Sequence, residues 1–161
     1  MHVQQAEMLE TLAVEVERVR RTLGVASASL SVWERDVGVL RTLVNTGTLA
    51  PGEQARPDDE TYPVHSFPAL VSLLDGRTPY CFGPGDPVDV SSASLAASLG
   101  KDTQAAAPVN VHGEVWGSLW VATLPGERPL GHADLPPIVR AANEIARVLA
   151  AGRGLAHQAR G

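Results

Sequence analysis

The sequence predicts a single α+β domain in which helices cover one face of a central, mainly antiparallel sheet and loops cover the other. Three observations support this fold class. The 161 residues are 44% hydrophobic and 19% charged, which suits one globular core. Long amphipathic helical patterns occupy both ends of the chain. Between them, strand-like segments follow one another in pairs joined by short turns, as in antiparallel hairpins.

The N-terminal pattern, residues 2–23, is that of an amphipathic helix. Its apolar residues recur at alternating steps of three and four and form one stripe: Leu9, Leu12, Val16, Val19 and Leu23. Gly24 follows directly after a turn that contains arginines, and this combination is typical of a helix end. The stripe also has the spacing of a coiled-coil seam, sustained for about two heptads.

Two strands are predicted next, over residues 26–33 and 39–45. Both segments are rich in strand-forming residues, and the polar, glycine-containing stretch between them suits a hairpin loop. Residues 47–59 carry prolines, glycine and charges without a period, so this segment is expected to be a loop.

Small elements fill the middle of the chain. Residues 67–74 are predicted to form a short helix with Ser66 as its N-cap, followed by a short strand over 78–82. A second small helix is expected over 91–99 and ends at Gly100.

The clearest hairpin joins predicted strands over residues 103–111 and 115–124. A long helix over 135–151 follows, with Asp134 expected as its N-cap. One face of this helix is apolar: Leu135, Ile138, Ala142, Ile145 and Leu149.

Side chains of a strand alternate between the two faces of its sheet. On the last strand this alternation predicts an aliphatic face and a face that mixes rings with a hydroxyl: Val115, Gly117, Leu119 and Val121 against Trp116, Ser118, Trp120 and Ala122. The first strand divides in the same way: Ala28, Leu30 and Val32 against Ser29, Ser31 and Trp33. Gly113 is expected to supply the positive φ of a tight hairpin, and Gly117 to let a neighbouring backbone approach.

This element order, with two sets of motifs, resembles the GAF domain family. The main motif is Ala107-Pro108-Val109 followed by residues 113–121, Gly-Glu-Val-Trp-Gly-Ser-Leu-Trp-Val. The second comprises Tyr62-Pro63, Phe67-Pro68 and residues 74–79. The likeness runs from about Leu9 to Leu149. It implies an N-terminal amphipathic helix (1–24), a GAF domain (25–151) and a C-terminal connector (152–161), with loops and small helices closing a pocket on the sheet face opposite the terminal helices.

The resemblance implies that a small ligand binds between the mixed polar and aromatic face and the cover above it. The candidate lining residues are Ser29, Ser31, Trp33, Trp116, Ser118 and Trp120 from the strands, and Tyr62, His65, Phe67, Tyr80 and Phe82 from the cover. Such pockets are mostly apolar with a few placed polar groups. The competing interpretation is that the tryptophans only fill space under the loops.

Several chemistries known from the family lack their residues here. Reduction of methionine sulfoxide needs two cysteines, and Cys81 is the only one. Bilin-binding relatives attach the pigment at a cysteine followed by histidine, whereas Phe82 follows Cys81. Heme would have to use His65, and a lone histidine is more often structural or solvated. Residues 123–126 lack the Asn-Lys of cyclic-nucleotide-binding relatives, which weakens that case. No particular cofactor follows from the sequence.

Other function classes are also disfavoured. The net charge is −5 without a basic stripe, so nucleic acid is not an expected partner. No apolar run approaches the roughly 20 residues of a membrane helix, which predicts a cytoplasmic protein. The histidines show no paired metal-ligand spacing. The acidic run 58–60 lies in a loop without a base or nucleophile and is expected to be solvated surface. We therefore expect no enzymatic activity.

The leading hypothesis is a sensory domain that binds a small molecule and relays the signal through dimeric terminal helices. The expected homodimer contacts are Leu9, Leu12, Val16, Val19, Ile138, Ile145 and Leu149. Residues 151–161 resemble connectors that lead into diguanylate cyclase (GGDEF) domains, the output of cyclic di-GMP signalling, although a kinase, a phosphatase or an antiterminator would fit as well. The alternative is a degenerate GAF domain that serves only as a dimerisation scaffold.

Overall fold

Terminal helices and a twisted sheet form the two main layers of the computed structural model, which describes residues 2–152 and the side chains from residue 5 onward. Within this range the elements, in chain order, are α1 His2–Leu23, β1 Ser27–Glu34, β2 Val39–Gly47, β3 Thr61–Pro63, the 3-10 turn η1 Val64–Ser66, α2 Pro68–Leu74, β4 Tyr80–Phe82, α3 Val90–Ser98, β5 Gln104–Val111, β6 Glu114–Ala122, the 3-10 turn η2 His132–Asp134 and α4 Leu135–Ala151. The predicted connector lies outside the described residues from position 153 on.

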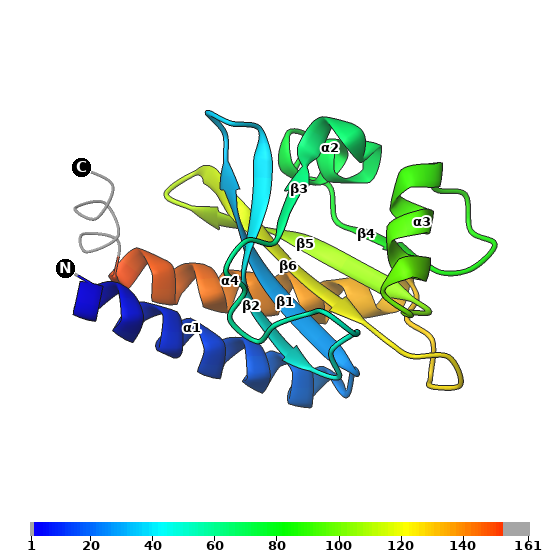
Figure 1. Cartoon of the computed structure of the whole chain (residues 1–161), viewed down its shortest axis with the longest axis horizontal. Coiled ribbons are helices and arrows are strands. Elements are labelled where there is room, and N and C mark those ends of the chain that lie inside the picture. Colours follow the sequence, from blue (N-terminus) through cyan, green and yellow to red (C-terminus); the bar gives the residue numbers. More distant parts are fainter. Residues whose placement is uncertain (1, 153–161) are drawn as a thin grey trace.

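The sheet has six strands in the order β3-β2-β1-β6-β5-β4 over the described residues, and each neighbouring pair is antiparallel. Helices α1 and α4 lie side by side across one face, whereas α2 and α3 lie on the other side of the sheet (Figure 1). The predicted α+β class, the antiparallel pairing and the division of helices between the two faces are therefore confirmed. Strand β3 is an addition, because the predicted loop ended at residue 59 and no element was predicted over residues 61–63.

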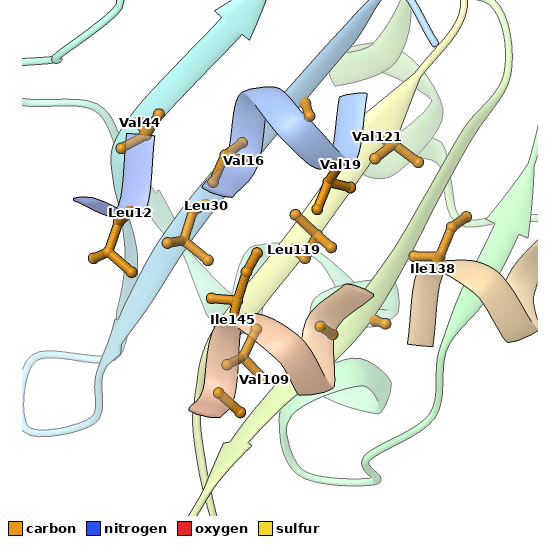
Figure 2. Close-up of a cluster of buried hydrophobic side chains, with 14 of the residues drawn as sticks. Leu12, Val16, Val19, Leu30, Val44, Val109, Leu119, Val121, Ile138 and Ile145 are labelled. Carbon is orange, nitrogen blue, oxygen red and sulfur yellow. The ribbon is translucent and has the colours of Figure 1, made fainter. Parts of the chain in front are cut away.

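The main hydrophobic core lies between the terminal helices and the sheet. Val16 of α1 and Ile145 of α4 point at Leu30 and Leu119 of the two central strands, and all four side chains are fully buried (Figure 2). Ala28 and Leu30 both face this core, as the alternation of β1 predicted.

The expected dimer contacts need correction, because they belong to this core. The side chains of Leu12, Val16, Val19, Ile138, Ile145 and Leu149 are buried within the single chain, and Leu9 is half-buried against the same cluster. These side chains could contact a second subunit only if they left the core against the sheet. The apolar stripes of both helices are used to cover their own sheet.

A β-bulge in the last hairpin reverses the predicted facing of two residues. Val109 pairs with Gly117 but Asn110 pairs with Val115, so Trp116 is an extra residue on β6. As a result Trp116 packs against the core under the terminal helices, whereas Val115 joins a small second cluster on the opposite face. The prediction placed each on the other face.

Gly117 of β6 lies directly against the backbone of β1. An added Cβ would stand 1.9 Å from the backbone oxygen of Ser31, so only glycine allows this strand pairing. Gly113 has φ +80° in the hairpin turn, as its position predicted.

One predicted helix cap is wrong, and another is right in position but makes no capping hydrogen bond. Helix α2 begins after Phe67 without a side-chain cap, and Ser66 ends η1 instead. Asp134 precedes α4 but its carboxylate turns back, where it accepts from the Gly131 amide at 2.8 Å. Asp89 is a genuine cap: its carboxylate accepts from the Ser92 amide at the start of α3.

Candidate functional site

A cavity of about 70 Å³ lies on the sheet face opposite the terminal helices. Its floor comes from β1, β2, β5 and β6, and its cover comes from α2, α3 and the segment between β2 and β3. The volume is far below the roughly 300–1,000 Å³ of sites for drug-sized ligands. The cavity therefore suits a small molecule.

Seven of the eleven candidate lining residues meet at this cavity: Ser29, Ser31, Tyr62, Phe67, Tyr80, Ser118 and Trp120. They come from four separate parts of the chain, namely β1, the segment from β3 to the start of α2, β4 and β6. Ser29 pairs with Trp120 and Ser31 with Ser118 across the two central strands.

The other four candidates lie elsewhere. Trp33 packs against the second cluster, formed around Leu40, Val64, Leu74 and Val115, and the Arg35 guanidinium lies 4.3 Å from its ring centre. Of the two rings expected to form one cavity wall, Trp120 alone lines the cavity. Trp116 faces the terminal helices because of the bulge. Phe82 is buried against Tyr80 outside the cavity, and His65 is exposed on η1.

One side of the cavity carries a connected set of polar groups. The Ser29 hydroxyl donates to Asn45 Oδ1 at 2.5 Å, and Asn45 Nδ2 donates to Glu60 Oε1 at 2.9 Å. The Tyr62 hydroxyl donates to the second oxygen, Glu60 Oε2, at 2.7 Å. Burial, reinforced by this carboxylate, raises the pKa of Tyr62, so its hydroxyl stays protonated and remains a donor.

The opposite side carries a side-chain amide whose oxygen has a hydrogen-bond partner and whose nitrogen has none in the part of the chain that the structure describes. The Trp120 ring nitrogen donates to Gln104 Oε1 at 3.1 Å. Since a tryptophan nitrogen only donates, this contact fixes the orientation of the amide. Gln104 Nε2 is then left buried at the cavity without a hydrogen-bond partner among the described residues. An unsatisfied buried donor of this kind is unusual and calls for an explanation.

Two carboxylates at the cavity were missed by the sequence analysis, Glu53 and Glu60. Glu60 was assigned to solvated surface with Asp58 and Asp59; those two are exposed, but Glu60 faces inward. A usable signal was present, because alternate residues of an extended segment share a face and Glu60 stands two positions before Tyr62.

Glu53 has a buried cationic neighbour. The ammonium of Lys101, the only lysine in the sequence, lies 3.7 Å from Glu53 Oε1 and donates to the Thr48 carbonyl at 2.8 Å. Both side chains are almost fully buried. Lys101 itself does not line the cavity, and none of the described lining residues is a lysine, arginine or histidine.

The remaining candidate chemistries find little support in this geometry. Cys81 packs on the side of the terminal helices rather than at the cavity, and burial raises the pKa of its thiol. In residues 2–152 no cluster of three potential metal ligands occurs. No helix in this range is long and apolar enough to cross a membrane.

Comparisons with solved structures agree with the fold. The phycocyanobilin-bound GAF domain of a cyanobacterial phytochrome is 15% identical, with a TM-score of 0.75, covering 94% of this chain and 89% of that chain. Residues 122 to 287 of a methyl-accepting chemotaxis protein are 18% identical, with a TM-score of 0.74 and 92% of each chain covered. The GAF domain of the Acinetobacter phosphoenolpyruvate-protein phosphotransferase is 12% identical, with a TM-score of 0.70, covering 93% and 86%.

These identities are low enough that they establish the fold alone. No curated protein matches the sequence. The model of the GAF domain family, however, matches residues 7–152, which include nearly all of the described chain. The chain therefore belongs to the GAF domain family, whose members serve as sensory and regulatory domains of bacterial signalling proteins.

Proposed function

We propose that this GAF domain is a ligand-binding input module, that it works in the cytoplasm and that it catalyses no reaction itself. The observation that carries the proposal is the polar floor of the cavity. Ser29, Ser31 and Ser118 are at least nine-tenths buried in the middle of the sheet, where a scaffold would place apolar side chains. The Ser29 and Ser31 hydroxyls pair with Asn45 and Thr42, so within the described range the buried group at this floor that lacks a partner is the Gln104 amide. A polar floor with an unpaired amide makes sense when a ligand supplies the missing partner.

Contacts between the cavity and α1 offer a route for the signal. Asn45 holds the cavity residues Ser29 and Glu60, and the hydroxyl of the next residue, Thr46, donates to Glu17 of α1. The covering segment is tied to the same helix where Arg56 lies 3.1 Å from Glu10. A ligand that shifts Asn45 therefore acts on α1 through its immediate neighbour.

The proposal includes a homodimer and an output domain attached to the terminal helices, such as a diguanylate cyclase. Because the inner residues of α1 are in the core, the subunit contact is assigned to the outer strip of this helix. Val14 is 59% exposed there, and it is the one large apolar side chain in the described part of α1 that is exposed.

A thermal-shift screen tests ligand binding directly. Neutral, cationic and anionic small molecules are added to the chain, and a ligand at 100 times its Kd should add about 2.7 kcal/mol of stability. Trp120→Ala should abolish binding, while Trp33→Ala, outside the cavity, should only destabilise. If no compound of any charge stabilises the folded chain, the alternative of a scaffold without a ligand replaces this proposal.

The relay is tested by hydrogen exchange. Ligand binding should change the protection of the α1 amides in the wild type. Thr46→Val keeps the shape of the side chain but removes the hydroxyl that donates to Glu17, so it should keep the affinity and lose most of the change in α1. An unchanged response in this variant would contradict the route through Thr46.

A further inference from the structure

The proposed ligand site, on which this inference rests, carries a charge imbalance. Glu53 and Glu60 both line the cavity. Lys101 neutralises Glu53 from outside the lining, whereas Glu60 has no ion-pair partner among the described residues. Arg41 pairs with Thr61, the residue after Glu60, but its guanidinium is engaged by Glu34 at 2.9 Å and by Asp59 at 3.2 Å. One negative charge at the cavity therefore remains unbalanced.

The second independent observation is the free donor across the cavity. Gln104 is 5% exposed, and its Nε2 lacks a partner while its oxygen is held by Trp120. A ligand that satisfies this amide must present a hydrogen-bond acceptor there. The cavity thus offers an anionic acceptor at one side and a neutral donor at the other.

The order of the strands places these two groups on either side of the cavity. Asn45, Ser29 and Trp120 lie in one row across β2, β1 and β6, and Asn45 holds Glu60 at one end of this row while Trp120 holds Gln104 at the other. Glu60 lies beyond β2 and Gln104 lies on β5, so one ligand that contacts both groups must span the floor formed by the two central strands.

We propose that the cavity binds a small primary amine in its ammonium form that also carries an oxygen acceptor, as in short amino ethers and amino alcohols. The ammonium group donates to the Glu60 side of the cavity, and the oxygen accepts from Gln104 Nε2. The ligand's positive charge balances Glu60. Phosphate-bearing ligands, such as nucleotides, are disfavoured because the described lining contains two carboxylates and no cationic side chain.

A set of four probes with nearly the same shape tests this inference. 2-Methoxyethylamine has both groups, n-butylamine lacks the oxygen, 2-methoxyethanol lacks the charge, and methoxyacetate reverses it. Calorimetric titration of the wild-type chain should rank 2-methoxyethylamine first. A neutral hydrogen bond is worth about 0.5–1.5 kcal/mol and one to a charged group about 1.5–3 kcal/mol, so n-butylamine should bind several-fold and 2-methoxyethanol about ten- to a hundredfold more weakly.

Matched variants then assign the binding to Glu60. Glu60→Gln should weaken 2-methoxyethylamine by about ten- to a hundredfold. Asp58→Asn removes the same charge from an exposed position of the same segment and should change the affinity by less than about twofold. The wild-type probe series decides the question even where Glu60→Gln fails to fold.

The outcomes separate this inference from the proposed function. Equal or tighter binding of 2-methoxyethanol or methoxyacetate overturns the amine assignment and leaves a ligand-binding domain. If none of the four probes binds but another compound in the broader screen does, the amine assignment is again overturned and a ligand-binding domain remains. Failure of every compound in both experiments overturns the inference and the proposed function together.

Discussion

Replacement of Gly117 by alanine should force apart the two central strands. The added Cβ would lie 1.9 Å from the Ser31 oxygen, 2.9 Å from the Ser31 carbonyl carbon and 3.0 Å from Val32 Cα, and all three atoms belong to the backbone. Ordinary contacts need about 3.5 Å, so β1 and β6 must separate locally by roughly 1.5 Å. That displacement stretches the adjacent ladder hydrogen bonds beyond their usual range.

The cost can be estimated from these contacts. Overpacking costs about 1–3 kcal/mol, and one or two weakened hydrogen bonds add about 1–2 kcal/mol. Alanine has a lower backbone entropy than glycine in the unfolded chain, and this difference offsets up to about 1 kcal/mol of the destabilisation. The net loss is then about 2–4 kcal/mol, or a Tm lower by roughly 5–15 °C for a chain of this length.

Thermal unfolding followed by circular dichroism checks this estimate. Gly131→Ala is the matched control, because Gly131 has an ordinary φ of −137° and nothing within 4 Å of an added Cβ. Its Tm should stay close to that of the wild type. Since Ser31 lines the cavity, Gly117→Ala should also weaken ligand binding. A Tm within about 1 °C of the wild type would refute the argument from close strand approach.

Three further predictions concern other elements. Val14→Glu should weaken a homodimer in sedimentation without lowering Tm much. Val16→Glu should instead unfold the chain, because it places a charge in the core. If Val14→Glu leaves the dimer unaffected, the outer strip of α1 is not the interface. Hydrogen bonds from Arg20, then from Thr46 and Arg21, hold the pKa of Glu17 well below its usual value, so Glu17 stabilises the fold above about pH 4.5 and loses this effect as the pH falls. Glu17→Gln should therefore flatten the loss of stability in acid denaturation. Lys101→Met should cost about 3–5 kcal/mol in urea unfolding by leaving the buried Glu53 charge uncompensated, and adding Glu53→Gln should restore part of it.

Patterns with a regular period were predictable from the sequence, and departures from the period were not. The stripe of α1 and the alternation of β1 follow directly from the spacing of apolar residues. The bulge at Trp116 inserts one residue into this alternation, and the sequence around it holds no distinct signal for the insertion. For that reason Trp116 and Val115 were placed on the wrong faces.

Contacts between distant segments were the second limit. Seven lining residues followed from the family's layout, but Glu60 was assigned to the surface because its segment has the composition of a loop. Its inward position depends on Asn45 and Tyr62, which bind it from two strands. The burial of the expected dimer residues has a similar cause, because a stripe does not reveal whether its own sheet or a partner covers it.

The antiparallel packing of α1 and α4 also has a consequence for how the domain joins other modules. Helix α4 ends where α1 begins, so close that a Cβ on Gly152 would meet the Met8 side chain at 1.8 Å (Figure 1). The polypeptide thus enters and leaves the fold at one corner. A domain of this shape can be inserted into a surface loop of another protein without stretching that loop open. For the same reason, a shift of α1 relative to α4 displaces the two ends of the described fold relative to each other at this corner.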